Sequence, residues 1–303
     1  MFSRDTQIAL LAGMAAGILF AISAYSVGGG MLLMYLPSLP LLCVGLMVGV
    51  RRVFIASLIA CVLIGILTAD ARNALFFAVF TVIPVLYFVH QALLWREDNN
   101  WYPVLSILAE LTLIIALFFL MLFIVAGNYG GLQTIITQGF SSELTVADPE
   151  VSRIMNWLIT DGSFLLIACS GWSWVLTLYG FAVLANALLK QRGVPLRASL
   201  ALTPVQLPAW LLVVVLINGA AAFFLQGTDR FVAETVFLLL LLPYFLTGLA
   251  LLHRLAGRWR HKVIWLMMFY ILLIFQVWIV PVMTVIGLYY QLAEMLDKHR
   301  QIR

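Results

Sequence analysis

The chain of 303 residues is 64% hydrophobic and 10% charged, whereas soluble domains have about 45–50% apolar and about 25% charged residues. A soluble protein of this length could not bury that much apolar surface in one core, but a bilayer solvates apolar side chains that face outward. The net charge of +4 comes from basic residues in short segments between apolar runs. These features exclude a soluble domain and a nucleic-acid-binding protein. They predict an all-α, polytopic transmembrane helical bundle in contact with membrane lipid.

Nine apolar runs are candidates for spanning helices, which need about 20 residues each. In chain order they are Gln7–Val27, Met31–Val50, Val53–Ala69, Ala74–Trp95, Trp101–Gly127, Ser163–Leu189, Pro208–Gln226, Phe231–Leu252 and Val263–Gln291. The first run follows Arg4 like the core of a signal peptide. However, it continues past Ala24 without a small-residue cleavage site, so we expect it to remain as the first transmembrane helix. The last run carries Pro281 and is either one tilted helix or a re-entrant hairpin, so we predict eight or nine spans.

Basic residues in the connections predict the orientation, because cytoplasmic loops are enriched in Lys and Arg. With a cytoplasmic N-terminus, the outer connections hold three of these residues, Arg72, Arg153 and Arg230. The cytoplasmic loops hold eleven, which are Arg4, Arg51, Arg52, Arg96, Lys190, Arg192, Arg197, Arg254, Arg258, Arg260 and Lys262. A hairpin in the last run would add Lys298, Arg300 and Arg303 to the cytoplasmic side. The sequence therefore predicts a multi-pass protein with its N-terminus in the cytoplasm.

One long connection, residues 128–162, separates five predicted spans in residues 1–127 from a C-terminal bundle in residues 163–303. Asp148 followed by Pro149 is typical of a helix start, and Gly162 is placed to end that helix. Two sets of apolar residues recur at the spacing of one helical face. They are Leu132, Ile135, Ile136 and Phe140, and then Val151, Ile154, Met155, Leu158 and Ile159. We predict amphipathic helices on the outer membrane surface, either as a plain strap, which we favour, or as a lid over a substrate cavity.

Polar residues inside apolar runs are the first candidates for a ligand site, because a charge in the membrane costs several kcal/mol unless it is paired or wet. Glu110 lies about ten residues into its run, which is roughly 15 Å deep. Asn218 and Gln276 lie near the middle of theirs. The three side chains indicate either a polar cluster around a cavity or separate helix–helix hydrogen bonds.

A break between the first two runs is the second candidate. Three glycines at 28–30, followed by Pro37 and Pro40, interrupt regular helix. Irregular backbone at membrane depth is tolerated only beside protein or water. The break therefore lines a binding site or forms a turn at the outer surface. Polar contacts to a ligand could come from three flanking residues, Tyr25, Ser26 and Tyr35.

Small residues recur every four positions in the first run, at Gly13, Gly17 and Ala21. Such a stripe lets another helix backbone approach closely. Internal packing is the favoured use, and an interface with a partner membrane protein is the alternative.

Catalytic and metal-binding patterns are missing from the sequence. It contains no HExxH, no GxSxG and no phosphate-binding loop, and its three cysteines have neither metal-ligand nor disulfide spacing. We therefore predict no enzyme activity, no cofactor and no metal.

The order of segments resembles a known family. A small-residue helix and the glycine-rich break precede PSLPLLCVGLMVGVRR (residues 37–52), a short run, the Asp70-Ala71-Arg72-Asn73 turn and ALFFAVFTVIPVLY (residues 74–87). This order resembles the YybS-like family of uncharacterised bacterial membrane proteins over most of the chain. Residues 5–125 in turn resemble the substrate-binding S components of energy-coupling-factor vitamin transporters. Unlike a compact S component, this chain continues with further helices after residue 162.

The resemblance implies an S-component-like core in residues 1–127 of a bacterial inner-membrane protein. It also implies that Gly13, Gly17 and Ala21 dock a coupling subunit, while outer loops and helix ends enclose a small molecule. The leading functional hypothesis is an integral protein of the bacterial inner (cytoplasmic) membrane that binds or transports a small molecule. The alternative is a non-transporting scaffold or assembly factor for the cell envelope.

Overall fold

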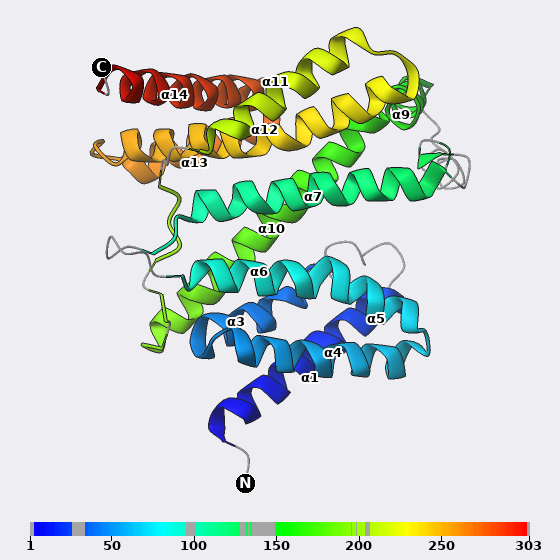
Figure 1. The fold of residues 1–303 in the computed structure, drawn as a ribbon. Helices are drawn as coiled ribbons and strands as arrows, with labels where there is room; N and C mark the ends of the chain where they lie inside the picture. Colours follow the sequence, from blue (N-terminus) through cyan, green and yellow to red (C-terminus); the bar gives the residue numbers. More distant parts are fainter. Residues whose placement is uncertain are drawn as a thin grey trace. The chain divides into compact units, whose positions relative to one another are not determined.

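The structure is a computed structural model that describes residues 3–25, 34–94, 101–127, 131–132, 134, 149–194, 196–197, 199–203 and 207–301. All regular elements that it describes are helices (Figure 1). They are α1 (Arg4–Tyr25), α3 (Ser38–Val48), α4 (Val50–Thr68), α5 (Ala71–Phe77), η1 (Ala78–Val82), α6 (Ile83–Ala92), α7 (Val104–Gly127), α9 (Pro149–Ile159), α10 (Ser163–Gln191), α11 (Ala209–Phe224), α12 (Gly227–Ala256), α13 (Lys262–Phe275) and α14 (Ile279–Gln301). The all-α prediction is confirmed for this part of the chain.

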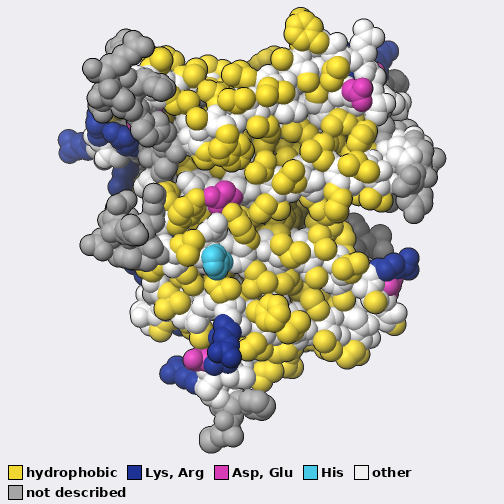
Figure 2. Space-filling model, viewed as in Figure 1, with side chains coloured by type: hydrophobic (Ala, Val, Ile, Leu, Met, Phe, Trp, Pro, Cys, Tyr) yellow, Lys and Arg dark blue, Asp and Glu magenta, His cyan; other side chains and the backbone are white. Residues whose placement is uncertain are grey.

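Seven described helices are long and apolar enough to cross a membrane. They are α1, α4, the continuous α5–η1–α6 helix (Ala71–Ala92), α7, α10, α12 and α14. Three further apolar helices, α3, α11 and α13, have 11, 16 and 14 residues. At about 1.5 Å per residue these are shorter than the roughly 30 Å hydrocarbon core. Hydrophobic side chains cover most of the face in Figure 2. These features are compatible with an integral, multi-pass membrane protein.

The described chain forms two compact units. Unit 1 consists of Met1–Ile107 and Trp174–Ala201, and unit 2 consists of Leu108–Ser173 and Leu202–Arg303. Both α7 and α10 therefore contribute residues to each unit. The boundaries that we predicted at residues 127 and 162 stay a prediction.

Unit 1 is built around the pair α1 and α4, with α3 and α6 beside it (Figure 1). Two tight reversals connect its helices. Gly49 joins α3 to α4 with φ 101°, a left-handed conformation that favours glycine. Asp70 then caps α5 by accepting a hydrogen bond from the backbone N–H of Arg72 at 2.9 Å. The side chain of Arg72 also pairs with Asp70 at 3.0 Å, and this pairing lowers the pKa of the Asp70 carboxyl.

The helix Ala71–Ala92 widens into a π-helical turn at η1, just before Pro84. Proline has no N–H to give to the carbonyl four residues earlier, which here belongs to Phe80. The α-helical donor of that carbonyl is therefore missing, although a π-helical turn can bond it to the N–H five residues on.

Unit 2 is centred on α12, which packs against α11 and α14. In α12, 72% of the most apolar window is buried, against 17–44% in the other six long helices. The crossing of α12 and α14 is closed by one glycine from each helix. A Cβ at Gly248 would overlap the carbonyl of Met283, and a Cβ at Gly287 would overlap the carbonyl of Tyr244.

The last predicted run is two helices, not one. It breaks after Phe275, and α14 begins at Ile279 and doubles back beside α12 (Figure 1). Pro281 therefore lies in the first turn of α14, where a missing N–H is tolerated. The break falls at Gln276–Trp278 and not at the proline, and the re-entrant hairpin and the number of spans stay predictions.

The helix predicted to start at Pro149 is present as α9. It ends as expected near Gly162, whose N–H donates to the carbonyl of Trp157 at 2.8 Å. On the predicted apolar face, Val151, Ile154 and Met155 are exposed. Asp148 and most of the earlier predicted helix, between 132 and 140, lie outside the described residues.

Candidate functional site

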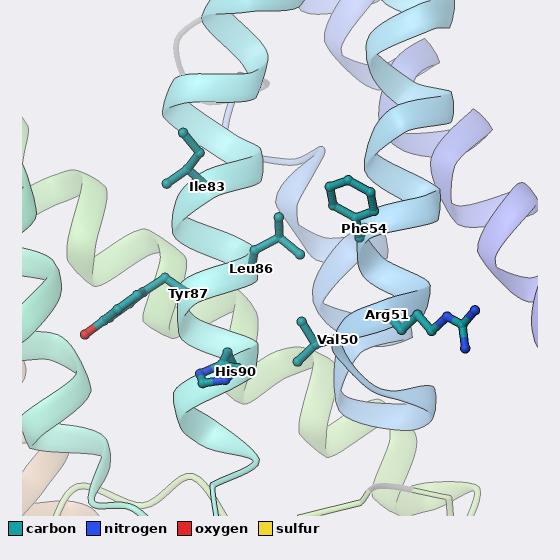
Figure 3. A pocket seen from close by; sticks show the side chains of 7 residues that line it. All are labelled: Val50, Arg51, Phe54, Ile83, Leu86, Tyr87 and His90. Carbon is teal, nitrogen blue, oxygen red and sulfur yellow. The ribbon is translucent and has the colours of Figure 1, made fainter.

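An open groove of about 580 Å³ lies between α4 and α6 in unit 1. We call it the α4–α6 groove. Its described lining residues are Val50, Arg51, Phe54, Ile83, Leu86, Tyr87 and His90. Figure 3 shows Leu86 pointing from α6 toward Val50 and Phe54 on α4. Because its walls are almost entirely apolar and it lies on the side of two candidate membrane spans, the groove suits an apolar chain better than a polar solute.

The polar groups of the groove gather toward one end. Ile83 lies at the other end, while His90 lies two helical turns further along α6 and Arg51 is the second residue of α4. The hydroxyl of Tyr87 receives a hydrogen bond from Nε2 of Gln91 at 3.0 Å. None of the described lining residues is acidic. This end of the groove can therefore attract an anionic group.

Several helix ends of unit 1 come together at the polar end of the groove. Nη1 of Arg52, at the start of α4, donates to Oγ1 of Thr6, near the start of α1, at 2.8 Å. The segment after α10 reaches the end of α3 through a hydrogen bond from the Leu196 N–H to the Leu46 carbonyl at 2.8 Å. The described Lys and Arg residues of these helix ends and of the segment after α10 are Arg4, Arg51, Arg52, Lys190, Arg192 and Arg197. Asp5 is the one acidic residue described among them. We call this region the basic end of unit 1.

Arg197 is buried in the basic end and connects several of its segments. It is 5% exposed, and its Nη1 donates to the carbonyls of Ala92 and Tyr102, both at 2.9 Å. Its Nε donates to the carbonyl of Ser199 at 2.8 Å, and its guanidinium lies 5.8 Å from the ring centre of Trp101. Burial lowers the pKa of the Arg197 guanidinium, but arginine stays protonated in proteins. A buried cation therefore ties the end of α6 to the start of α7.

Two tryptophans of α10 have roles that the sequence did not reveal. In unit 1, Nε1 of Trp174 donates to the carbonyl of Phe80 at 3.1 Å, which is the carbonyl four residues before Pro84. In unit 2, Nε1 of Trp172 donates to the carbonyl of Leu238 in α12 at 2.9 Å, and its ring stacks on Phe245. Pro84 could have indicated the acceptor, because the carbonyl four residues before a proline lacks its α-helical donor. Nothing in the sequence indicated the donor.

The polar residues predicted to form a cluster all belong to unit 2. Glu110 is half-buried on α7. Nδ2 of Asn218 bonds the carbonyl of Val214 within its own helix at 2.9 Å. Gln276 is exposed at the break between α13 and α14. The bond of Asn218 is thus within one helix and not between two helices, and both interpretations of the three residues stay predictions.

The residues predicted around the glycine-rich break belong to unit 1. Tyr25 is exposed at the end of α1, and its hydroxyl donates to the carbonyl of Leu67 at 3.2 Å. Tyr35 is half-buried, and its carbonyl accepts from Oγ of Ser38 at 2.7 Å. Ser26 and the glycines at 28–30 lie outside the described residues. Neither tyrosine is among the described lining residues of the α4–α6 groove.

The small-residue stripe of α1 is buried against α4. A Cβ at Gly13 would overlap the carbonyl of Ala56, and one at Gly17 would lie 3.2 Å from the carbonyl of Ala60. Ala21 is also buried. This is the internal packing that we favoured, and α1 would have to leave α4 before this stripe could contact a partner.

A second hollow, of about 370 Å³, follows one face of α13 in unit 2. Its described lining residues are Val263, Leu266, Met267, Tyr270, Ile271 and Ile274. The hydroxyl of Tyr270 lies 3.2 Å from Nε2 of His253 on α12. No residue of α13 is buried, so this apolar face has no cover from the described chain.

Comparison with known proteins adds no relative. No protein-family model matches the chain, and neither a curated protein nor a solved structure matches it. The resemblance to the YybS-like family and to S components therefore stays a prediction from the order of sequence segments.

Proposed function

We propose that this chain is an integral protein of the bacterial inner membrane that binds a small amphipathic molecule and, like the S components that it resembles, takes part in moving it. The α4–α6 groove is the observation that carries the proposal. It offers an apolar molecule a partly enclosed wall on two adjacent candidate spans, and it offers an anionic head the side chains of Arg51 and His90.

The proposal places the basic end of unit 1 in the cytoplasm. The described residues there include six Lys and Arg and one Asp. At the opposite end of α4 and α5, the exposed cation Arg72 is neutralised by Asp70 at 3.0 Å. An excess of Lys and Arg on one side is the usual mark of the cytoplasmic side. The N-terminus, which begins α1 at the basic end, is then cytoplasmic as well.

Native mass spectrometry of the gently purified protein tests the proposal. We expect a retained small molecule of amphipathic character. Leu86→Trp fills the middle of the groove and should remove this molecule, because a bulkier ring occupies its place. Ile66→Trp is the matched control, since Ile66 is 70% exposed on the same helix pair but does not line the groove.

Two results would contradict the proposal. The first is retention of the molecule by Leu86→Trp as well as by the control. The second is loss of the molecule in Glu110→Gln together with its retention in Leu86→Trp, which would assign the ligand to the cavity predicted from the sequence instead.

A cell-envelope scaffold is the second candidate, and α13 is the observation that favours it. Its apolar residues are exposed along the whole helix, which would suit a partner helix in the membrane. Purification of stoichiometric envelope-synthesis proteins with an empty α4–α6 groove would favour the scaffold.

A further inference from the structure

The chemistry of the α4–α6 groove narrows its ligand, if the groove binds one as proposed above. The groove extends along α6 from Ile83 to His90, and seven residues of helix span about 10 Å. One leaflet of the hydrocarbon core is about 15 Å thick, half of the roughly 30 Å total. The groove therefore fits within a single leaflet, and it accommodates part of an acyl chain that runs parallel to the two helices.

The end of the groove identifies which leaflet and which kind of head group. Arg51 is exposed, and the two ion pairs of the described residues, Asp70–Arg72 and Arg230–Glu234, do not include it. Arg51 is among the described lining residues, and Figure 3 shows its side chain leaving α4 on the side away from α6, with the guanidinium directed outward. Long basic side chains commonly lay their stems along apolar surface while the charge reaches the head-group level. His90, also exposed, supplies a second nitrogen donor at this level.

The surrounding charge favours an anion over a zwitterion. The described part of the basic end has six Lys and Arg against one Asp, and Arg197 within it is held by carbonyls, not by a carboxylate. Each basic residue near a membrane surface contributes about 1 kcal/mol to the attraction of anionic lipid. A free anionic solute would gain from the charges but not from the apolar walls of the groove.

We infer that the α4–α6 groove binds an anionic phospholipid of the cytoplasmic leaflet, with an acyl chain against Phe54, Ile83 and Leu86 and its phosphate at Arg51 and His90. The acyl chain is expected in the groove because its walls are apolar, and the phosphate at one end because the basic residues lie there. The ligand class is thus an amphipathic phosphodiester with net negative charge.

The test reconstitutes the full chain in vesicles of equal parts phosphatidylglycerol and phosphatidylethanolamine, and then counts retained lipids by native mass spectrometry. The wild type should retain phosphatidylglycerol in preference. In the double variant Arg51→Gln/His90→Gln this preference should fall by at least about fivefold, because the roughly 1 kcal/mol of attraction lost with the Arg51 cation corresponds to about fivefold in affinity.

Two control variants test whether the effect is specific to the position and charge of Arg51. Arg72→Gln removes an exposed arginine from the opposite end of α4 and α5 and should leave the preference unchanged, while Arg51→Lys keeps the charge and should retain most of it. An equal preference in the double variant and the wild type overturns the inference about the head group. If Leu86→Trp still loses all retained lipid, the proposed groove survives that result; if Leu86→Trp retains the lipid, both proposals fail.

Discussion

In each unit one buried side chain binds the segment that follows α10, and the two side chains differ in charge. In unit 1 the fastening group is the cation of Arg197, which donates to the carbonyls of Ala92, Tyr102 and Ser199. In unit 2 it is the neutral amide of Gln291, which is fully buried on α14. The amide of Gln291 accepts from the N–H of Leu207 at 2.9 Å and donates to its carbonyl at 2.5 Å, as a neighbouring β-strand would.

The difference follows from what each group must satisfy. Of the carbonyls around Arg197, that of Ala92 ends α6, while those of Tyr102 and Ser199 lie in connecting segments, and one guanidinium with five N–H groups can serve all three. Leu207 has one backbone N–H and one backbone carbonyl to satisfy, and a single uncharged side-chain amide bonds to both. A cation near the membrane surface also agrees with the cytoplasmic location proposed for the basic end of unit 1. The neutral pair in unit 2 gives no information about the side of the membrane.

The largest predicted effect compares these two groups. Arg197→Met should destabilise the protein by about 5 kcal/mol, near the low end of the sum for three hydrogen bonds from a charged donor at about 1.5–3 kcal/mol each, and lost packing adds little with Met in place. Gln291→Met should cost about 2 kcal/mol, from two neutral bonds of about 1 kcal/mol each. The measurement is the unfolding free energy in detergent micelles.

Arg197→Lys is the control for charge alone. It keeps the cation but cannot present donors in the planar fork that serves three carbonyls, so it should recover only a minor part of the loss. A Lys variant as stable as the wild type would mean that charge and not hydrogen bonding holds this segment.

The glycine contacts give the second comparison. In unit 1, α1 supplies Gly13 against the carbonyl of Ala56, while in unit 2, α12 and α14 each supply a glycine, Gly248 and Gly287, against the other helix. Gly287→Ala should therefore cost about 2 kcal/mol, as overpacking typically does, and more than Gly13→Ala. The loss in Gly13→Ala should be smaller because the overlap of its added Cβ with a carbonyl is smaller than at Gly287, and because in unit 2 a glycine of each helix meets the backbone of the other.

Gly180→Ala on α10 is the matched control, because a Cβ there would meet nothing within 4 Å. It should be neutral or stabilising by up to about 1 kcal/mol, since alanine favours helix. Thermal unfolding in the same micelles compares the three variants. A loss in Gly180→Ala as large as in Gly287→Ala would show that close helix contact does not explain the effect.

These glycines also show how far the sequence could go. The stripe of Gly13, Gly17 and Ala21 was recognisable because it repeats within one helix, and internal packing was the favoured use. Gly248 and Gly287 are single residues on separate helices, and their meeting depends on how α12 and α14 are aligned. No local pattern carries that alignment, so the tighter of the two crossings was not predicted.

The same limit applies to the candidate site. Hydrophobicity and length predicted most of the helices, and the helix beginning at Pro149 was predicted from its own local signals. A polar cluster at Glu110, Asn218 and Gln276 was inferred from similar depth in the membrane, but depth does not say which helices adjoin. The α4–α6 groove is lined by ordinary apolar residues at helical spacing, which in a sequence look the same as residues that face lipid.

The two tryptophans of α10 give the smallest and most selective comparison. Trp174→Phe and Trp172→Phe make the same chemical change, in which an indole N–H is lost and an aromatic ring is kept. Their acceptors differ: no N–H lies four residues after the Phe80 carbonyl, because that residue is Pro84, while the Leu238 carbonyl is positioned to accept from the N–H of Leu242 within α12. The indole of Trp174 therefore stands in for an i+4 backbone donor, whereas the indole of Trp172 adds to one.

We expect Trp174→Phe to cost about 1.5 kcal/mol and Trp172→Phe about 0.5 kcal/mol, within the range measured for hydrogen bonds inside membrane proteins. Pro84→Ala is the informative partner variant, because an alanine N–H would give the Phe80 carbonyl a donor from its own helix. In that background Trp174→Phe should cost no more than Trp172→Phe does in the wild type. If the cost of Trp174→Phe is unchanged by Pro84→Ala, the indole stabilises unit 1 by packing, and the π-helical turn at η1 does not depend on its hydrogen bond.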